Sequence, residues 1–124
     1  NAIFQLDLDS NNMKKIAGTG LQGYSGDGGN ALSATFNGPK GIAYSRTDNS
    51  LYVADTENHA VRKIDLATGL IDTVLGTGER GDGPDGRPYD CQLNRPHGVC
   101  IFERVLYVAD SENNRIRALT GVVS

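Results

Sequence analysis

Long apolar runs are missing from this 124-residue sequence. No stretch approaches the roughly 18 consecutive apolar residues that a membrane span needs, so the sequence predicts a soluble chain. No secretory leader is recognisable either. Because the chain starts with Asn1 and not with Met, we expect a trimmed chain or a part of something longer, and its localisation stays unknown.

Cysteine is also scarce, since the chain has only Cys91 and Cys100. Two thiols make no disulfide framework, and their separation is not a zinc-ligand spacing. In the repeat alignment described below they stand opposite Ala34 and Ala43. This position favours small, buried, unreactive thiols over the alternatives, which are a disulfide or a reactive thiol.

A large excess of one charge is absent, because 12 Lys and Arg stand against 15 Asp and Glu, a net charge of −3. This balance argues against nucleic acid or an anionic membrane as an obligatory partner. The nearest approach to a basic cluster is Lys14, Lys15, Arg62 and Lys63. These residues lack the interleaved aromatics of an RNA-binding surface, so we predict neither nucleic acid nor membrane as partner.

What the sequence does contain is an internal repeat. Residues 51–64 and 106–119 are identical at eight of fourteen positions, and both begin Leu-Tyr-Val-Ala-Asp. Three further blocks recur in the same order: residues 3–8 match 61–66, residues 16–20 match 74–78, and residues 36–42 match 93–99. Four blocks in one order indicate a repeated structural unit.

Each unit is predicted to contain four short strands, at residues 40–44, 51–55, 60–66 and 70–75 in the complete copy. The connections are short and rich in Asn, Asp, Thr and Gly, as antiparallel hairpins require. No helical periodicity is present. The sequence therefore predicts an all-β chain built from four-stranded antiparallel sheets.

The order of the blocks sets the boundaries of the single segment 1–124. Residues 1–20 are the end of a unit, residues 36–78 a complete unit, and residues 93–124 the start of a further unit. Gly-rich loops at 20–29 and 78–86 join the units. Glycines at matched loop positions predict a backbone with positive φ. The matched pairs are Gly23 with Gly81 and Gly28 with Gly86.

Several blocks resemble the NHL repeat family: Asn37-Gly-Pro-Lys-Gly-Ile-Ala43, Leu51-Tyr-Val-Ala-Asp55, Asn58-His-Ala-Val-Arg-Lys-Ile64 and Gly76-Thr-Gly. Ser25-Gly-Asp-Gly-Gly29 is similar to the loop of bacterial members with long repeats. The resemblance implies β-propeller blades, commonly six to a ring, of which this chain holds about two. A WD40 propeller has a similar period but is disfavoured, because the chain has no Trp.

Two blades leave a hydrophobic face bare, because each blade packs both faces against its neighbours. We expect a longer chain or identical chains to complete the ring. A homotrimer is favoured, since three chains of two blades give six, and the contact between chains is then head-to-tail. One copy of the third strand is surplus at each junction and must be displaced.

Asp55 and Asp110 end the second strand of each unit, before Thr/Ser-Glu-Asn. A carboxylate at the rim is a chemical candidate, but recurrence at matched positions favours a structural role. We expect each Asp to accept hydrogen bonds from turn amides, with Asn58 and Asn113 in the tight turn position.

The same reasoning applies to other matched pairs. Arg62 and Arg117 predict a structural contact with a carboxylate on a neighbouring strand. Tyr52 and Tyr107 are expected between blades with the hydroxyl near the surface. In the Gly-rich loops, Asp27 and Asp85 are candidates for Ca²⁺. A turn role is favoured for them, because each loop offers only one or two carboxylates.

His97 is the candidate metal ligand. It opens a first strand, where the other unit has Lys40. This strand lines the channel of a propeller, so three chains in a ring place three copies of His97 around the axis. Three imidazoles are a possible Zn²⁺ site with an open position. The resemblance implies a precedent in propeller lyases with channel histidines, and the alternative is a solvated histidine beside a ring of Lys40.

The function predicted from the sequence is a non-catalytic binding scaffold that presents loops and a channel mouth to a protein or small ligand. This prediction rests on family analogy, because a fold does not define a function. One alternative is a metal-assisted lyase or hydrolase at the channel, with Zn or Ca as its cofactor. The other is a propeller fragment without independent activity.

Overall fold

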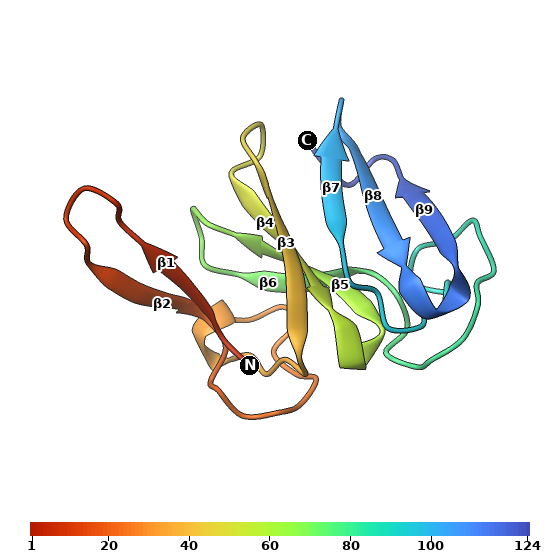
Figure 1. Ribbon diagram of the computed structural model, residues 1–124, viewed down its shortest axis with the longest axis horizontal. Helices are drawn as coiled ribbons and strands as arrows, with labels where there is room; N and C mark the ends of the chain where they lie inside the picture. Colours follow the sequence, from red (N-terminus) through yellow and green to blue (C-terminus); the bar gives the residue numbers. More distant parts are fainter.

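In the computed structural model, residues 1–124 form three antiparallel β-sheets that stand side by side (Figure 1). The first sheet pairs β1 (Ile3–Leu6) with β2 (Met13–Ala17). The second has the order β3 (Pro39–Ser45), β4 (Ser50–Asp55), β5 (Ala60–Asp65), β6 (Ile71–Leu75). The third has the order β7 (Val99–Phe102), β8 (Val105–Asp110), β9 (Arg115–Leu119). The predicted all-β fold of antiparallel blades is confirmed.

Short 3₁₀ turns follow the matched strands β4 and β8. They are η2 (Thr56–Asn58) and η3 (Ser111–Asn113), and a third turn, η1 (Ala31–Ser33), lies in the first inter-sheet connection. Each of η2 and η3 ends at a left-handed residue, His59 with φ 53° and Asn114 with φ 56°. Asn58 and Asn113 lie in these tight turns, as predicted, and each is followed directly by the left-handed residue.

The hydrophobic core is divided between the two gaps that separate the sheets. Side chains alternate along a strand, so neighbouring residues on β4 enter opposite gaps. Val53 packs with Ile3 and Phe36 against the first sheet, and Tyr52 packs with Leu106 against the third. All of these side chains except Ile3 are fully buried, and Ile3 is 8% exposed. The complete sheet is therefore covered on both faces.

The first strands of the second and third sheets, β3 and β7, lie next to each other. The two backbones approach closely at Gly41, where an added Cβ would collide with the carbonyl oxygen of His97 and lie 3.1 Å from Cα of Gly98. This contact sets the spacing of the two sheets at the edge where the first strands meet.

The glycines of the two loops have two different roles. Gly28 and Gly86 have φ values of 83° and 122°, as predicted. Gly23 and Gly81 do not have positive φ, so that prediction was wrong for this pair. A Cβ on Gly23 would lie 2.7 Å from the hydroxyl of Thr35, and glycine is required there for close packing. None of the helical turns is long and apolar enough to span a membrane.

Candidate functional site

A buried ion pair joins the second and third strands of the complete sheet. Asp55, the last residue of β4, and Arg62 on β5 are both fully buried, and Arg62 Nη1 donates to Asp55 Oδ2 at 2.9 Å. The same carboxylate accepts from the side chain of Asn58 and from the backbone N–H of Asn37, both at 2.8 Å. Asp55 therefore holds the turn after β4 to the segment before β3.

This geometry gives Asp55 a different set of donors from the predicted one. The carboxylate accepts no backbone amide of its own turn. Burial raises its pKa, and the hydrogen bonds from Asn58, Asn37 and Arg62 oppose that rise. Because three donors occupy the carboxylate, its role is structural.

Arg62 extends this clamp to the Gly-rich loop. Its Nε donates to Asp27 Oδ1 at 3.1 Å, Nη1 donates to the carbonyl of Thr35 at 3.1 Å, and Nη2 donates to the carbonyl of Ser25 at 2.9 Å. The guanidinium is thus bound to both the sheet and the loop. The predicted contact between Arg62 and a carboxylate on a neighbouring strand is confirmed.

Aromatic and hydroxyl groups complete the same clamp. The rings of Tyr24 and Phe36 have centroids 5.0 and 5.1 Å from the guanidinium carbon of Arg62, within cation–π range. Thr73 on β6 donates to Asp27 Oδ2 at 2.6 Å, and its hydroxyl lies 2.7 Å from that of Tyr24. Asp27 already has a cation as partner, which disfavours the Ca²⁺ role considered from the sequence.

A second clamp recurs in the third sheet with more solvent around it. Arg117 on β9 donates to Asp110 at 2.8 Å, to Asp85 at 2.6 Å and to Asp82 at 2.5 Å. Arg115 also donates to Asp82. The hydrogen bond from Arg115 has the largest effect on the pKa of the Asp82 carboxyl and lowers it, and the hydrogen bond from Arg117 lowers it further. The side chain of Asp85 is 88% exposed. The matched residues Arg62 and Arg117 therefore both anchor a Gly-rich loop, Arg62 through one aspartate and two backbone carbonyls and Arg117 through two aspartates.

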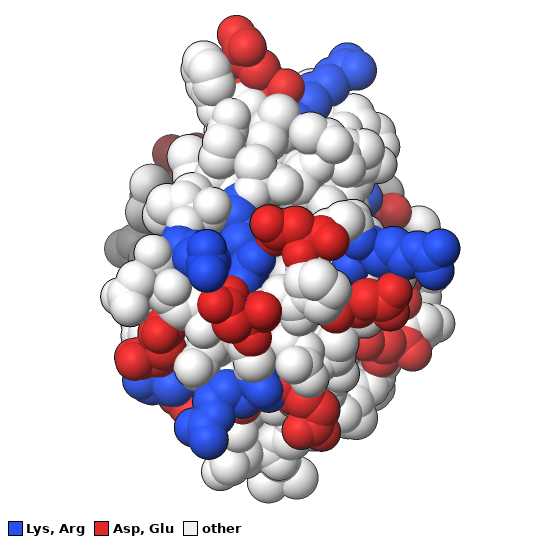
Figure 2. Space-filling model, turned by 90° about the vertical axis from the view of Figure 1, so that its right-hand side faces the viewer, with Lys and Arg blue, Asp and Glu red and all other residues white.

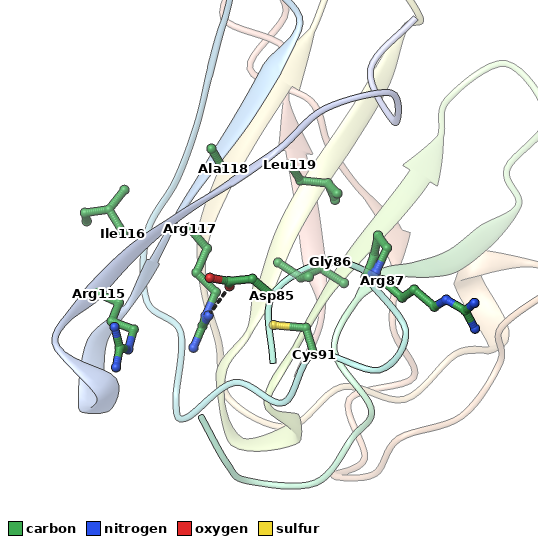
Figure 3. A pocket seen from close by; sticks show the side chains of 11 residues that line it. Asp85, Gly86, Arg87, Cys91, Arg115, Ile116, Arg117, Ala118 and Leu119 are labelled. Carbon is green, nitrogen blue, oxygen red and sulfur yellow. Dashed lines mark hydrogen bonds and ion pairs between the residues drawn. The ribbon is translucent and has the colours of Figure 1, made fainter. Parts of the chain in front are cut away.

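A groove of about 590 Å³ lies along the unpaired outer edge of β9 (Figure 3). The loop at Gly86 forms its opposite wall, and the Asp85–Arg117 ion pair lies between the walls. In the complete sheet β6 occupies the matched place, where Gly28 N–H donates to Ile71 O at 2.7 Å. The groove therefore lies where a fourth strand would pair with β9.

His97 lies in the turn before β7, where its backbone N–H donates to the backbone carbonyl of Ala109 at 3.1 Å. Its Nδ1 donates to the carbonyl of Arg95 at 2.7 Å, which leaves Nε2 for another partner. No group of three or more His, Cys, Asp or Glu side chains in the chain is arranged to hold a metal ion. One chain alone therefore does not fit Zn²⁺, and the ion would require His97 from several chains.

The two cysteines have different environments. Cys91 is buried and free, as predicted, and burial raises the pKa of its thiol. Cys100 is free but exposed, so the prediction that it is buried was wrong. Alternation along β7 explains the difference, because Val99 and Ile101 face the core and place Cys100 on the other side.

The two matched tyrosines also differ. Tyr52 is fully buried between the sheets, and its hydroxyl donates to Asp48 Oδ2 at 2.8 Å and to the carbonyl of Val122 at 3.2 Å. Tyr107 is 37% exposed. The predicted packing between blades is thus observed for Tyr52 and not for Tyr107 within this chain.

One polar junction was not predicted from the sequence. Arg95 has a left-handed backbone with φ 51°, and imidazole nitrogens of His59 and His97 hydrogen-bond to its N–H and C=O. A signal was present, because the repeat places Arg95 opposite Gly38, which also has positive φ. A non-glycine residue at such a position is uncommon and marks a constrained site.

Comparison with known proteins identifies relatives of these sheets. Protein SUPPRESSOR OF QUENCHING 1, chloroplastic, from Arabidopsis thaliana is 41% identical over 107 residues, which are 82% of this chain and 10% of that protein. NHL repeat-containing protein 2 from Homo sapiens is 33% identical over 73% of this chain and 13% of its own length. The chain thus spans about a tenth of the length of these relatives.

A solved structure from Bacteroides thetaiotaomicron, a structural genomics protein of unknown function, superimposes with a TM-score of 0.82 at 24% identity. The match covers 94% of this chain and 29% of that one, and it supports the fold alone. Residues 3–96 match the teneurin NHL domain family, and residues 93–119 match the NHL repeat family. The chain therefore belongs to the NHL repeat family.

Proposed function

We propose that the chain is a non-catalytic binding scaffold, which presents fixed loops and a channel mouth to a protein or small ligand. The observation that carries this proposal is the engagement of its carboxylates. Asp55 and Asp27 are both bound by Arg62, and Asp110 and Asp85 by Arg117. Loops held in this way lose little conformational freedom on binding, which favours recognition by a preformed surface.

We further propose that identical chains complete the ring, and the first support is an apolar groove. The groove has a volume of about 420 Å³ and lies between the first and second sheets. It includes Ile42 and Tyr44 on β3, which are 51% and 53% exposed. On β7, at matched positions, Val99 and Ile101 pack against the core that contains Tyr52. In the second and third sheets, Tyr52 covers Val99 and Ile101. In the groove, no tyrosine covers the matched residues Ile42 and Tyr44.

The occupant that fits this groove is the third sheet of a second copy. Tyr107 on β8 matches Tyr52 on β4 and is exposed in its own chain. Placed beside Ile42 and Tyr44, it would repeat the contact that Tyr52 makes with Val99 and Ile101. This contact is head-to-tail, because it joins different surfaces of the two copies. It forms a closed ring only if the rotation that relates one copy to the next divides a full turn evenly.

The groove along β9 gives a second support for the same arrangement. β2 matches β6, the fourth strand of the complete sheet, in the repeat alignment, so β2 of another copy is the strand that fits beside β9. β1 of that copy must then leave β2. Figure 2 shows basic and acidic groups interspersed over the side of the molecule where this groove lies, without a broad area of one sign.

Solution mass tests ring closure. Light scattering coupled to size exclusion should give three times the chain mass of 13.2 kDa. Tyr107→Ser should shift the population to the monomer, because it removes the side chain that fills the groove. Leu70→Ser is the control, since Leu70 is 46% exposed and lines neither groove, and it should leave the trimer intact. A well-behaved monomer of the unaltered chain would exclude ring closure.

A metal-assisted reaction at the channel is the second candidate, and one observation favours it. The Nδ1 of His97 is fixed by the carbonyl of Arg95, the arrangement that orients metal-binding imidazoles. The scaffold proposal expects no stoichiometric zinc after purification at neutral pH, measured by plasma emission spectrometry. Zinc at one ion per three chains, and its loss in His97→Ala, would overturn the non-catalytic assignment.

A further inference from the structure

The junction between successive sheets is built from one repeated hydrogen bond. Asn1 Oδ1 accepts from the backbone N–H of Gly38 at 2.8 Å, and His59 Nδ1 accepts from the backbone N–H of Arg95 at 3.0 Å. Asn1 and His59 are matched positions of the repeat, and so are Gly38 and Arg95. A side chain at the start of a third strand thus binds the left-handed residue that precedes the next sheet.

The two junctions differ in one chemical property. An asparagine amide accepts a hydrogen bond at any ordinary pH, whereas an imidazole nitrogen accepts one only when it is unprotonated. The N–H of Arg95 points at His59 Nδ1, so the proton of neutral His59 is on Nε2. Protonation would place a second N–H against that of Arg95 and remove the bond.

We propose that the junction between the second and third sheets is a pH-sensitive joint, in which protonation of His59 releases the backbone of Arg95. The second histidine at this turn responds differently. His97 donates from Nδ1 to the carbonyl of Arg95, and a donor keeps its hydrogen bond when the ring becomes protonated. Acid therefore breaks one of the two imidazole contacts and preserves the other.

Arg95 is also under backbone constraint. A left-handed conformation is unfavourable for a non-glycine residue because its Cβ crowds the backbone, and the matched Gly38 avoids that cost. The guanidinium of Arg95 donates to Glu57 at 2.8 Å and to Glu112 at 3.3 Å, so it joins η2 and η3. When the N–H of Arg95 loses its acceptor, one of the contacts that holds this conformation is gone.

Charged groups from three elements face His59. Glu57 on η2 and Glu79 in the loop after β6 favour the imidazolium, whereas Arg80 in that loop and Arg95 before β7 disfavour it. Burial is the largest influence and lowers the pKa of His59 below its usual value of 6.5. Glu57 stays ionised in this range, because the hydrogen bond from Arg95 lowers its pKa.

The sign of the pH effect follows from these groups. The native state binds a proton at His59 less readily than the unfolded chain, whose pKa is near 6.5. The contribution of His59 to stability is therefore complete above that pH. It decreases as pH falls through the pKa of the folded state, and it is lost below it.

Amide hydrogen exchange measured by NMR tests the joint. The protection factor of the Arg95 amide, corrected for intrinsic exchange, should fall as pH decreases from about 7.5 to 5, by up to about tenfold for each unit by which the pKa of His59 is depressed. The amide of Gly38 is the internal control and should keep its protection. Parallel loss at both amides, or constant protection of Arg95, would overturn the proposal.

His59→Asn is the matched variant. Asparagine occupies the corresponding left-handed position at Asn114, with φ 56°, so the substitution suits the backbone. The variant should fold and should show Arg95 protection that does not vary over the same pH range. A pH dependence that persists in the variant would assign the effect to a different group and overturn the proposal.

Discussion

Replacing Arg62 with alanine is expected to lower the free energy of unfolding by about 3–5 kcal/mol, because it leaves the buried Asp55 carboxylate without its counter-charge. The variant also loses the anchor of the first Gly-rich loop, since Arg62 donates to the side chain of Asp27 and to the carbonyl of Ser25. Urea unfolding followed by circular dichroism at neutral pH measures the loss.

Arg115→Ala is the matched control for this prediction. Arg115 also lies on the third strand of its sheet and pairs with an aspartate, but the side chains of Arg115 and Asp82 are 58% and 45% exposed. An exposed pair is screened by solvent and contributes little to stability, so this variant should unfold nearly as the unaltered chain does. Equal losses in the two variants would contradict the special role assigned to the buried clamp.

The pH dependence of Arg62→Ala separates charge from packing. Burial already raises the pKa of Asp55 above 3.8 when Arg62 is present, and it rises further when the guanidinium is removed. The native variant then binds a proton that the unfolded chain has released, so acid stabilises it relative to the unaltered chain. The difference in stability should narrow as pH falls from about 7 to 4. A constant difference would indicate a packing defect instead.

The strands were predictable because two independent signals agree on them. Residues 51–55 and 106–110 are identical, and both are followed by turn-forming residues. Antiparallel hairpins depend on local sequence, so the repeat sets the strand order as well as the strand positions. The matched arginines Arg62 and Arg117 predicted an ion pair for the same reason, because both partners recur.

The missed features depend on contacts between units. His59 and Arg95 are 36 residues apart, and their hydrogen bond exists only because successive sheets stand side by side. Both residues are departures from the repeat, since Asn1 and Gly38 hold the matched positions. Departures of this kind were visible in the sequence. The identity of the partner across the gap was not, because the repeat specifies the sheets and not the side chains that join them.

The exposed Cys100 shows a related limit. Its match to Ala43 indicated a small buried residue, yet the facing of β7 follows from alternation with Val99 and Ile101. A small residue at a matched position indicates the size of side chain that fits when another sheet packs over it. It does not indicate whether the chain contains the sheet that would pack there.

Gly41→Ala is expected to lower the free energy of unfolding by about 1–3 kcal/mol through overpacking between β3 and β7. The new Cβ would meet the carbonyl oxygen of His97 and lie 3.1 Å from Cα of Gly98. Both are backbone atoms, so relief requires the two strands to move apart and not merely a side chain to rotate. Thermal and urea unfolding measure the loss.

Gly98→Ala decides whether that loss comes from the contact between sheets. Gly98 is the repeat match of Gly41, and a Cβ there meets only Ala109 Cβ at 3.8 Å, an ordinary van der Waals distance. Gly98 lies just before β7 and does not have positive φ, so alanine is accommodated there and this variant should be as stable as the unaltered chain or slightly more stable. Matched losses at both glycines would mean that the two first strands do not approach at Gly41. A loss confined to Gly41 would show that the backbone of β3 at Gly41 and the segment before β7 are in close contact.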